Sequence, residues 1–331
     1  MIRLLFISPE KTDTCSFYRN GGIAPSLERK YPDCRITVAQ WNQITLHWQV
    51  LLGYDVVMLQ RPYAKEHLSL CEYIKNLKIP LWVDYDDNLL MVPSENKNFE
   101  LYNPGTREDI KKILQAADVV SVTTEALMQA FLPHNKNIKV IPNAFNDFAF
   151  RNPPIRKGRS PLILWRGGDS HIKDILSMQG PIDQATLAFP EWQFIFMGYF
   201  PWFLRDDKRA NIFSMPPNDV ILYFNNTMKM FPAVVHVPLY ESPFNRAKSN
   251  ITYIEASYFG AATICPDWDE WKKPGALNYT TPESYFELIR AVVKREIDSQ
   301  AKAAEAWDYI RTELTLSKIN ELRKELVNTL I

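Results

Sequence analysis

The chain has 331 residues, more than a single hydrophobic core usually serves, so two domains of ordinary size are expected. Hydrophobic residues make up 46% of the sequence and charged residues 23%, which is typical of a globular protein and excludes a disordered one. The 38 Lys and Arg balance the 38 Asp and Glu, so no overall charge draws the chain to nucleic acid or to an anionic membrane. A local basic groove is not excluded by this balance.

The four cysteines are scattered and form no CxxC pair, which argues against both a disulfide framework and a zinc site. The sequence starts directly with a strand-like run instead of the apolar region of a signal peptide. No apolar run approaches the length of a transmembrane helix. We therefore expect a cytoplasmic protein with reduced thiols and no transmembrane segment.

Short apolar runs alternate with amphipathic stretches over the first 150 residues. The runs lack polar–apolar alternation, which is typical of parallel strands that helices cover on both faces. The predicted strands are Arg3–Ser8, Arg35–Ala39, Val56–Leu59, Leu81–Val83, Val119–Val122 and Lys139–Ile141. The predicted helices are Ile23–Lys30, Ala64–Leu77, Arg107–Ala117 and Glu125–Phe131. Residues 1–150 are thus expected to form one doubly wound α/β domain.

The alternation of apolar runs and amphipathic stretches stops after residue 150 and begins again at residue 162. Residues 151–161 are rich in proline and charge and predict a linker. A second doubly wound domain is expected over 162–331, ending in a tail from 282 to 331 that is helical throughout. Its predicted strands are Leu162–Trp165, Trp192–Met197, Val234–Val237 and Ala262–Cys265. Two such domains bind ligands between the carboxyl ends of their strands, in enzymes and in binding proteins alike, so this fold does not decide the function.

The polar run after the predicted strand Val234–Val237 has the features of an anion site. Ser249 is a good N-cap for a helix that starts near it, and free backbone N–H groups at a helix N-terminus attract anions. Lys248 adds a point charge suited to a diphosphate. Glu255, about two turns further on, can accept hydrogen bonds from both hydroxyls of a ribose. The alternative interpretation is an ordinary loop and helix with a solvated Lys and Glu.

This run resembles the donor-site signature of the retaining glycosyltransferases known as group one or family four. The similarity is greatest to a divergent bacterial and phage-type subgroup with an FNxxKSxxxYxEAxxxG-like pattern. The matching residues are Phe244, Asn245, Lys248, Ser249, Tyr253, Glu255, Ala256 and Gly260. The resemblance implies the two-domain GT-B architecture, with Asn245, Ser249, Tyr253 and Glu255 at the donor nucleotide. The common family pattern has a second glutamate eight positions earlier; Ala247 stands there, and the role of Glu241 is open.

A second segment, from Trp165 to Asp174, resembles the G-S-x-x-H-x-x-D-like turn of the same family. Glycines at Gly167 and Gly168 let backbone amides approach the donor phosphates, and Arg166 adds charge complementarity. We interpret His171 as a helix-start residue in preference to a catalyst. Two shorter runs, 140–146 and 122–127, resemble the family's "IPNG(I/V)D" and "V-S-x-x-L" runs.

The acidic run after the fourth predicted strand allows three interpretations. Asp-x-Asp binds the metal of the other glycosyltransferase architecture, GT-A, but a GT-A enzyme does not restart the α/β pattern. The subgroup named above has a D-x-D-D run at this place. We favour Asp84 and Asp86 as groups that bind sugar or acceptor hydroxyls, over metal ligands or a purely structural loop. No metal site is predicted.

A loop with Tyr18 and Arg19 follows the first strand. It is not a GxGxxG fingerprint, so a dinucleotide site is not indicated. The subgroup has a similar Tyr-Arg pair, which implies that Arg19 reaches the leaving diphosphate. A solvated arginine at a helix start is the equal alternative.

The resemblance implies glycosyl transfer from a nucleoside-diphosphate sugar to a hydroxyl group, with retention and without a further cofactor. Lys248 and Arg166 would stabilise the charge on the leaving diphosphate. The acceptor is a glycan, a lipid-linked sugar or a hydroxylated base in phage DNA; the sequence does not indicate the donor sugar, the nucleobase or the oligomeric state. The alternatives are a non-enzymatic nucleotide- or sugar-binding protein and an epimerase of the GT-B type.

Overall fold

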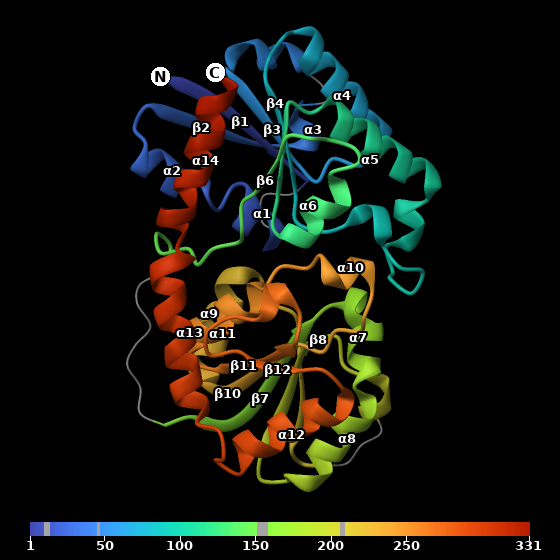
Figure 1. Cartoon of the computed structure of the whole chain (residues 1–331), viewed down its shortest axis with the longest axis vertical. Helices are drawn as coiled ribbons and strands as arrows, with labels where there is room; N and C mark the ends of the chain where they lie inside the picture. Colours follow the sequence, from blue (N-terminus) through green and yellow to red (C-terminus); the bar gives the residue numbers. More distant parts are fainter. Residues whose placement is uncertain (10–13, 45–46, 151–157, 206–208) are drawn as a thin grey trace.

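The computed structural model describes the chain except residues 10–13, 45–46, 151–157 and 206–208. The described residues form two six-stranded sheets, one in each half of the chain (Figure 1). All neighbouring strands pair in parallel, as the unbroken apolar runs predict. Most of the expected linker lies outside the described residues, so the domain boundaries stay predictions.

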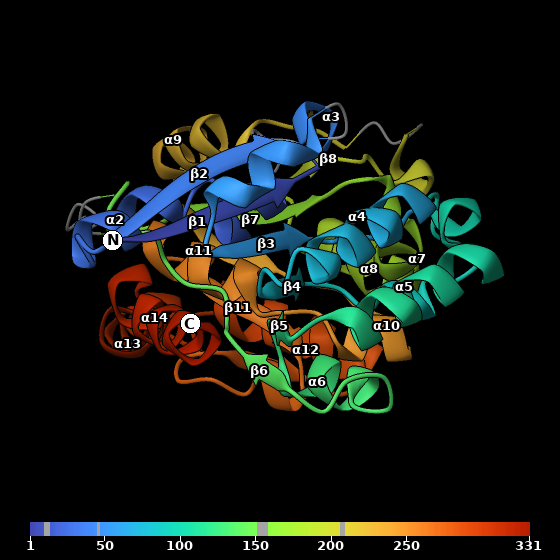
Figure 2. The ribbon, with the colours of Figure 1, turned by 90° about the horizontal axis from the view of Figure 1, so that it is seen from above.

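The first sheet has the strand order β2-β1-β3-β4-β5-β6, and Figure 2 shows these strands following one another across the sheet. Its strands are β1 (Ile2–Ser8), β2 (Cys34–Gln40), β3 (Val56–Gln60), β4 (Leu81–Tyr85), β5 (Val119–Val122) and β6 (Ile138–Val140). The helices of this half are α1 (Thr14–Arg19), α2 (Ala24–Lys30), α3 (Trp41–Ile44), α4 (Lys65–Asn76), α5 (Pro104–Ala116) and α6 (Glu125–Phe131). Short 3-10 helices are η1 (Trp48–Gly53), η2 (Leu89–Met91) and η3 (Phe99–Tyr102). Every residue of β3, β4 and β5 is buried, which places these strands at the centre of the core.

The second sheet has the strand order β12-β11-β10-β7-β8-β9. Its strands are β7 (Ser160–Gly167), β8 (Gln193–Gly198), β9 (Ile212–Met215), β10 (Pro232–His236), β11 (Ala262–Pro266) and β12 (Leu277–Tyr279). The helices of this half are α7 (Ile172–Ser177), α8 (Gln179–Ala188), α9 (Val220–Met230), α10 (Pro243–Arg246), α11 (Ile251–Phe259), α12 (Pro282–Val293), α13 (Ser299–Glu313) and α14 (Leu316–Leu330). Short 3-10 helices are η4 (Asp169–His171), η5 (Trp202–Leu204) and η6 (Asp269–Trp271).

The expected helical tail is confirmed, and it consists of three helices, α12, α13 and α14, with two short interruptions between them. Asp298 caps the start of α13 and Thr315 caps the start of α14, each by accepting a hydrogen bond from a backbone N–H. Helix α14 returns to the first half, where Asn320 Nδ2 donates to Ser26 Oγ of α2 at 3.2 Å. Figure 1 shows both termini at this end of the molecule. No helix of the described part is long and apolar enough to cross a membrane.

Two strands that the sequence did not predict complete the second sheet at its edges. Strand β9 has four residues and β12 has three. Both lie at an end of the strand order, so each pairs with one neighbour only. Such short edge strands are fixed by the ladder they join, and local composition carries little signal for them.

Candidate active site

The strand orders place one switch point in each sheet. In the first sheet the chain leaves β1 for β2 on one side and returns to β3 on the other. In the second sheet β7 leads to β8 on one side, and β10 pairs with β7 on the other. Ligands of such sheets bind beyond the carboxyl ends of the strands at the switch point. A ligand cavity is therefore expected after β1, β3, β7 and β10.

A cavity of about 420 Å³ lies at this place between the two halves. From the first half it is lined by Thr14, Cys15, Tyr18, Arg61, Asp86, Asp87, Leu89, Val92, Asn96, Asn98, Tyr102 and Asn143. Its lining from the second half includes Trp165, Arg166, Gly167, Gly168, Ser170, His171, His236, Phe244, Lys248, Ser249 and Trp271. A second cavity of about 190 Å³ shares the wall formed by Thr14 and 166–168, and is also lined by Glu255, Tyr223 and Asn218. Of the predicted site residues, the structure thus brings Tyr18, Asp86, Arg166, Gly167, Gly168, Lys248, Ser249 and Glu255 to the two cavities.

The end of β7 brings Arg166 and Gly167 to both cavities, and Gly168 directly after the strand joins them. A Cβ atom at Gly167 would come within 2.5 Å of the Trp165 ring, so packing inside the protein requires glycine there. A Cβ atom at Gly168 would meet nothing within 4 Å. The space beside Gly168 is therefore open on the cavity side, where a ligand can approach the backbone closely.

Glu255 is 1% exposed and holds two side chains from opposite halves. Its Oε2 atom accepts hydrogen bonds from Arg166 Nε at 2.9 Å and Nη2 at 2.5 Å. Its Oε1 atom accepts one from the Tyr18 hydroxyl at 2.8 Å. Burial by itself would lower the pKa of Arg166, but the Glu255 carboxylate outweighs it and raises that pKa above its usual value. Arg166 is thus a permanent cation at the cavity wall.

Lys248 lies just before α11, whose N-terminus faces the larger cavity through Ser249, Ile251 and Thr252. Asn250 is the N-cap of this helix, so the expectation of an N-cap at Ser249 is wrong by one residue. The Ser249 hydroxyl instead accepts a 2.9 Å hydrogen bond from Asn143 Nδ2 of the first half. Lys248 Nζ lies 3.6 Å from Asp87 Oδ1, also across the two halves.

Arg61, which sequence reasoning missed, organises the acidic run of the first half. It pairs with Asp86 and with Asp87 Oδ2, the latter at 2.6 Å. Its backbone has φ +49°, which a non-glycine residue rarely adopts, and its N–H donates to the carbonyl of Asp84 at 2.8 Å. Burial raises the pKa of Asp86; for Asp87 burial is outweighed by Lys248 and Arg61, which lower its pKa. The switch-point rule could have found Arg61, because it follows β3 directly.

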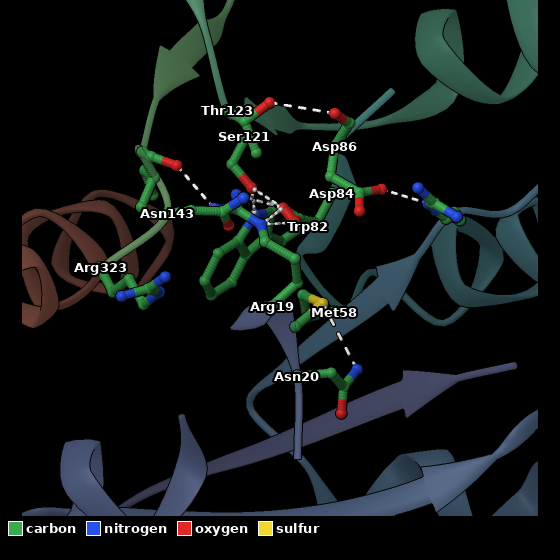
Figure 3. A network of polar contacts seen from close by, with 12 residues as sticks. Arg19, Asn20, Met58, Trp82, Asp84, Asp86, Ser121, Thr123, Asn143 and Arg323 are labelled. Atoms are coloured by element: carbon green, nitrogen blue, oxygen red, sulfur yellow. Dashed lines mark hydrogen bonds and ion pairs between the residues drawn. The ribbon is translucent and has the colours of Figure 1, made fainter. Parts of the chain in front are cut away.

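Asp84 and Arg19 lie together in the interior and line neither cavity. The side chains of Arg19 and Asp84 are each 2% exposed, and Arg19 Nη2 lies 2.6 Å from Asp84 Oδ1. Ser121 Oγ donates to the same oxygen at 3.0 Å, and Arg19 Nη1 donates to the carbonyl of Ile141 at 2.6 Å (Figure 3). Arg323 of α14 lies beside this network, and burial lowers its pKa to about 9. The geometry therefore gives Asp84 and Arg19 a structural role, and Asp86 and Asp87 are the carboxylates at the cavity wall.

Three other residues of the resembling run do not reach the cavities. Asn245 is 1% exposed, and its Nδ2 donates to Asp174 Oδ1 at 2.6 Å. The Tyr253 hydroxyl donates to the carbonyl of Pro274 at 2.7 Å, so this side chain braces α11 from its buried side. Glu241 is exposed and pairs with Arg246 at 2.6 Å.

Residues 92–98 of the first half reach across to the second half beside the larger cavity. Asn96 Nδ2 donates to the carbonyl of Ser170 at 3.4 Å. Lys97 pairs with Asp169 at 3.4 Å, and Glu95 pairs with Lys173. These contacts close one side of the cleft. Among the described residues, no three His, Cys, Asp or Glu side chains are grouped so as to hold a metal ion.

Two doubly wound parallel sheets with a cleft between their carboxyl ends define the GT-B fold. Sucrose-phosphate synthase from Thermosynechococcus elongatus matches 100% of this chain and 99% of its own, with a TM-score of 0.74 and 12% identity. Anabaena HepE in complex with UDP-glucose matches 99% of this chain and 100% of its own, with a TM-score of 0.71 and 11% identity. A putative UDP-N-acetylglucosamine 2-epimerase from Listeria monocytogenes matches 99% and 96%, with a TM-score of 0.62 and 12% identity.

Identities this low establish the fold alone. The sequence matches no protein-family model, and no curated protein is significantly similar to it. The chain is therefore a GT-B protein, and the subgroup that its motifs resemble stays a prediction.

Proposed function

We propose that this protein transfers a sugar from a nucleoside-diphosphate sugar to a hydroxyl acceptor, with retention at the anomeric carbon. The observation that carries the proposal is the wall built by Arg166, the Gly167–Gly168 turn, Lys248 and the N-terminus of α11. These groups come from two segments far apart in the sequence and meet at the switch point of the second sheet. Two cations, a glycine backbone that a ligand can approach closely and the N–H groups of a helix N-terminus together suit a diphosphate.

The smaller cavity suits the nucleoside. A carboxylate has about four lone-pair positions, and Arg166 and Tyr18 use three on Glu255. One position on Oε1 is left, so Glu255 can accept a hydrogen bond from one ribose hydroxyl, not from both. The adjoining lining of Tyr223, Val220 and Asn218 offers apolar contact and one amide to a base.

In the proposed reaction the bond between the anomeric carbon and the phosphate oxygen breaks, and its electron pair goes to the diphosphate. Arg166, Lys248 and the α11 N-terminus stabilise the charge that develops there. The acceptor hydroxyl bonds to the same face of the sugar, and its proton goes to the departing phosphate oxygen. Asp86 and Asp87 lie on the opposite wall, where they can accept hydrogen bonds from acceptor or sugar hydroxyls. Asn245 and Tyr253 support these groups from behind.

The acceptor classes are a glycan, a lipid-linked sugar and a hydroxylated base in phage DNA. An epimerase acting on a sugar nucleotide is the second candidate, because a putative enzyme of that kind shares the fold. It is less favoured because the run from Phe244 to Glu255 resembles the donor-site pattern of the glycosyltransferases and not that of these epimerases.

Incubation with UDP-, GDP-, ADP- and dTDP-sugars, followed by assay of free nucleoside diphosphate, tests the proposal. Release that depends on an added acceptor supports transfer, whereas an isomerised sugar nucleotide without release supports the epimerase. Absence of both reactions and of any thermal stabilisation by these ligands contradicts a nucleotide-sugar enzyme. The Arg246→Ala variant, which removes an exposed arginine outside both cavities, is the control for loss of positive charge.

A further inference from the structure

A buried relay of side chains holds His171 at the wall of the larger cavity. His171 Nδ1 lies 2.8 Å from Asp174 Oδ2; the histidine side chain is 31% exposed and that of Asp174 3%. The other oxygen of Asp174, Oδ1, accepts hydrogen bonds from Asn245 Nδ2 at 2.6 Å and from the backbone N–H of Tyr240 at 3.4 Å. The relay therefore joins α7, which carries Asp174, to α10, which carries Asn245.

This arrangement fixes the orientation and the tautomer of the imidazole ring. Asn245 Nδ2 and the Tyr240 N–H can only donate, so Asp174 acts as their acceptor and presents its second oxygen to His171. Nδ1 of the ring then carries a hydrogen, and Nε2 is left without one in the neutral form. Protonation of the ring adds a hydrogen at Nε2, away from Asp174. Only the charged form of His171 can donate a hydrogen bond from that atom.

The charged groups around His171 come from both halves. Asp174 lies on α7, which begins directly after His171, and Asp87, in the loop after β4, interacts electrostatically with His171. Lys248, from the loop before α11, also faces Asp87, and both Lys248 and His171 act to lower the pKa of the Asp87 carboxyl. The neighbouring Asp169 and Lys173 pair with Lys97 and Glu95. His171 and Lys248 thus act on one anionic group, and both line the same cavity.

We infer that the His171 imidazolium, together with Lys248, donates a hydrogen bond from Nε2 to the leaving diphosphate, and that Asp174 and Asn245 are its positioning residues. The inference rests on the proposed function. No proton is consumed: the electron pair of the broken bond goes to the phosphate oxygen, the acceptor proton follows it, and His171 keeps its own proton. His171 is the N-cap residue of α7, as the sequence analysis expects, and the inferred role is additional, because the ring lies at the cavity wall with a carboxylate behind it.

The kinetic test is turnover as a function of pH between about pH 5 and pH 8, the range in which histidine changes charge. The parent should lose activity as the pH rises. His171→Ala should lower turnover at the acidic end by about tenfold to hundredfold, the size of one hydrogen bond to a charged group, and should abolish the pH dependence. His171→Gln should restore part of the activity without the pH dependence. Asp174→Asn should lower turnover at the acidic end, because an amide cannot accept from Asn245 and also accept from His171 Nδ1 as the two carboxylate oxygens do.

His47→Ala is the matched control, because His47 is exposed and lines neither cavity. Its pH profile should equal that of the parent. A His171→Ala variant that keeps the pH dependence, or stays within about threefold of the parent at the acidic end, would overturn the inference and leave sugar transfer standing.

If no sugar nucleotide is turned over, binding of UDP, GDP and ADP tests the His171 contact separately from the proposed sugar transfer. The terminal phosphate of the diphosphate also loses a proton in this range and affects both proteins alike. The affinity of the parent relative to that of His171→Ala should therefore fall as the pH rises. If no sugar nucleotide is turned over but this difference in binding is found, the proposed function fails and the His171 contact stands. If none of the three diphosphates binds at any pH, both are overturned.

Discussion

The hydroxyl of Tyr18 donates a 2.8 Å hydrogen bond to Oε1 of Glu255, so a side chain that follows the first strand is held by a carboxylate in the other half of the molecule. The same carboxylate holds Arg166. Two further hydrogen bonds cross the cleft nearby, from Asn143 Nδ2 to Ser249 Oγ and from Thr124 Oγ1 to the carbonyl of Ala247. The groups proposed to hold the donor are thus also the groups that hold the two halves together.

The first prediction concerns Tyr18→Phe. The change removes one buried hydrogen bond to a charged group and keeps the ring, so the free energy of unfolding should fall by about 1.5–3 kcal/mol. Thermal unfolding measures this, and circular dichroism should show the parent's secondary structure. An unchanged melting temperature would mean that the hydrogen bond between the halves contributes nothing in solution.

The second prediction concerns Glu255→Gln. The variant keeps an acceptor for Tyr18 but leaves Arg166 as an unpaired, largely buried cation. Breaking a buried pair in this way should lower the free energy of unfolding by about 3–5 kcal/mol. Donor nucleotide affinity should also fall, because Arg166 is no longer held toward the diphosphate. For this reason Glu255→Ala, which removes the acceptor for Tyr18 as well, is expected to destabilise the fold.

Glu241→Gln is the control for Glu255→Gln, because it removes the exposed glutamate of the same segment. Its stability should stay within about 0.5 kcal/mol of the parent. Calorimetric titration with nucleoside diphosphates compares the two variants. If Glu255→Gln binds the nucleotide as tightly as Glu241→Gln, Glu255 is not part of the donor site.

Much of the fold could be predicted from the sequence, because buried parallel strands are continuous apolar runs. The cavity residues could be predicted in part: Arg166 and the two glycines come at the end of such a run, and Lys248 lies in the polar run between a strand and a helix. The pairing of Arg19 with Asp84 could not be predicted, because nothing local distinguishes a carboxylate that meets a buried arginine from one that faces a cleft. The pairing of Arg61 with Asp86 and Asp87 was missed for the same reason: the partners lie 25 residues or more apart in the sequence, and only the folded sheet brings them together.

The third prediction uses Glu270, whose pKa is raised to about 7 by burial, partly offset by Lys273. The folded state binds this proton more tightly than the unfolded state does, so this group's contribution to stability falls as the pH rises from about 4.5 to 7. Glu270→Gln should therefore raise the melting temperature relative to the parent by about 3–6 °C at pH 8 and by little at pH 4.5. Melting curves of both proteins at the two pH values measure the difference. A variant equally or less stable at pH 8 would show that Glu270 is not penalised in the fold.

The fourth prediction is that turnover survives EDTA. Arg166 and Lys248 supply positive charge to the diphosphate, and Asp86 and Asp87 are already paired with Arg61. The initial rate should therefore be the same with and without the chelator. Loss of activity in EDTA, restored by Mn²⁺ or Mg²⁺, would instead assign Asp86 and Asp87 to a metal ion.

The fifth prediction concerns Lys248→Ala. Lys248 is 16% exposed and lies 3.6 Å from Asp87, and Asp87 keeps its 2.6 Å pairing with Arg61 when Lys248 is removed, so no carboxylate is left unpaired. Charge on the leaving diphosphate grows as the glycosidic bond breaks, so loss of this cation should lower turnover more than donor affinity. One preorganised contact of this kind is worth about 10²–10³ in rate. The variant should therefore keep a near-normal melting temperature, still bind the nucleotide and lose most transfer.

Lys272→Ala is the matched control for Lys248→Ala, because Lys272 is an exposed lysine paired with Asp267 outside both cavities. It should keep the turnover of the parent. Single-turnover measurements on both variants separate donor binding from the chemical step. If Lys248→Ala turns over within a few-fold of Lys272→Ala, the diphosphate does not depend on Lys248, and the Arg166 turn with its glycines becomes the main phosphate contact. If donor affinity falls but the single-turnover rate of the bound donor equals that of Lys272→Ala, Lys248 binds ground state and transition state equally and does not act in catalysis.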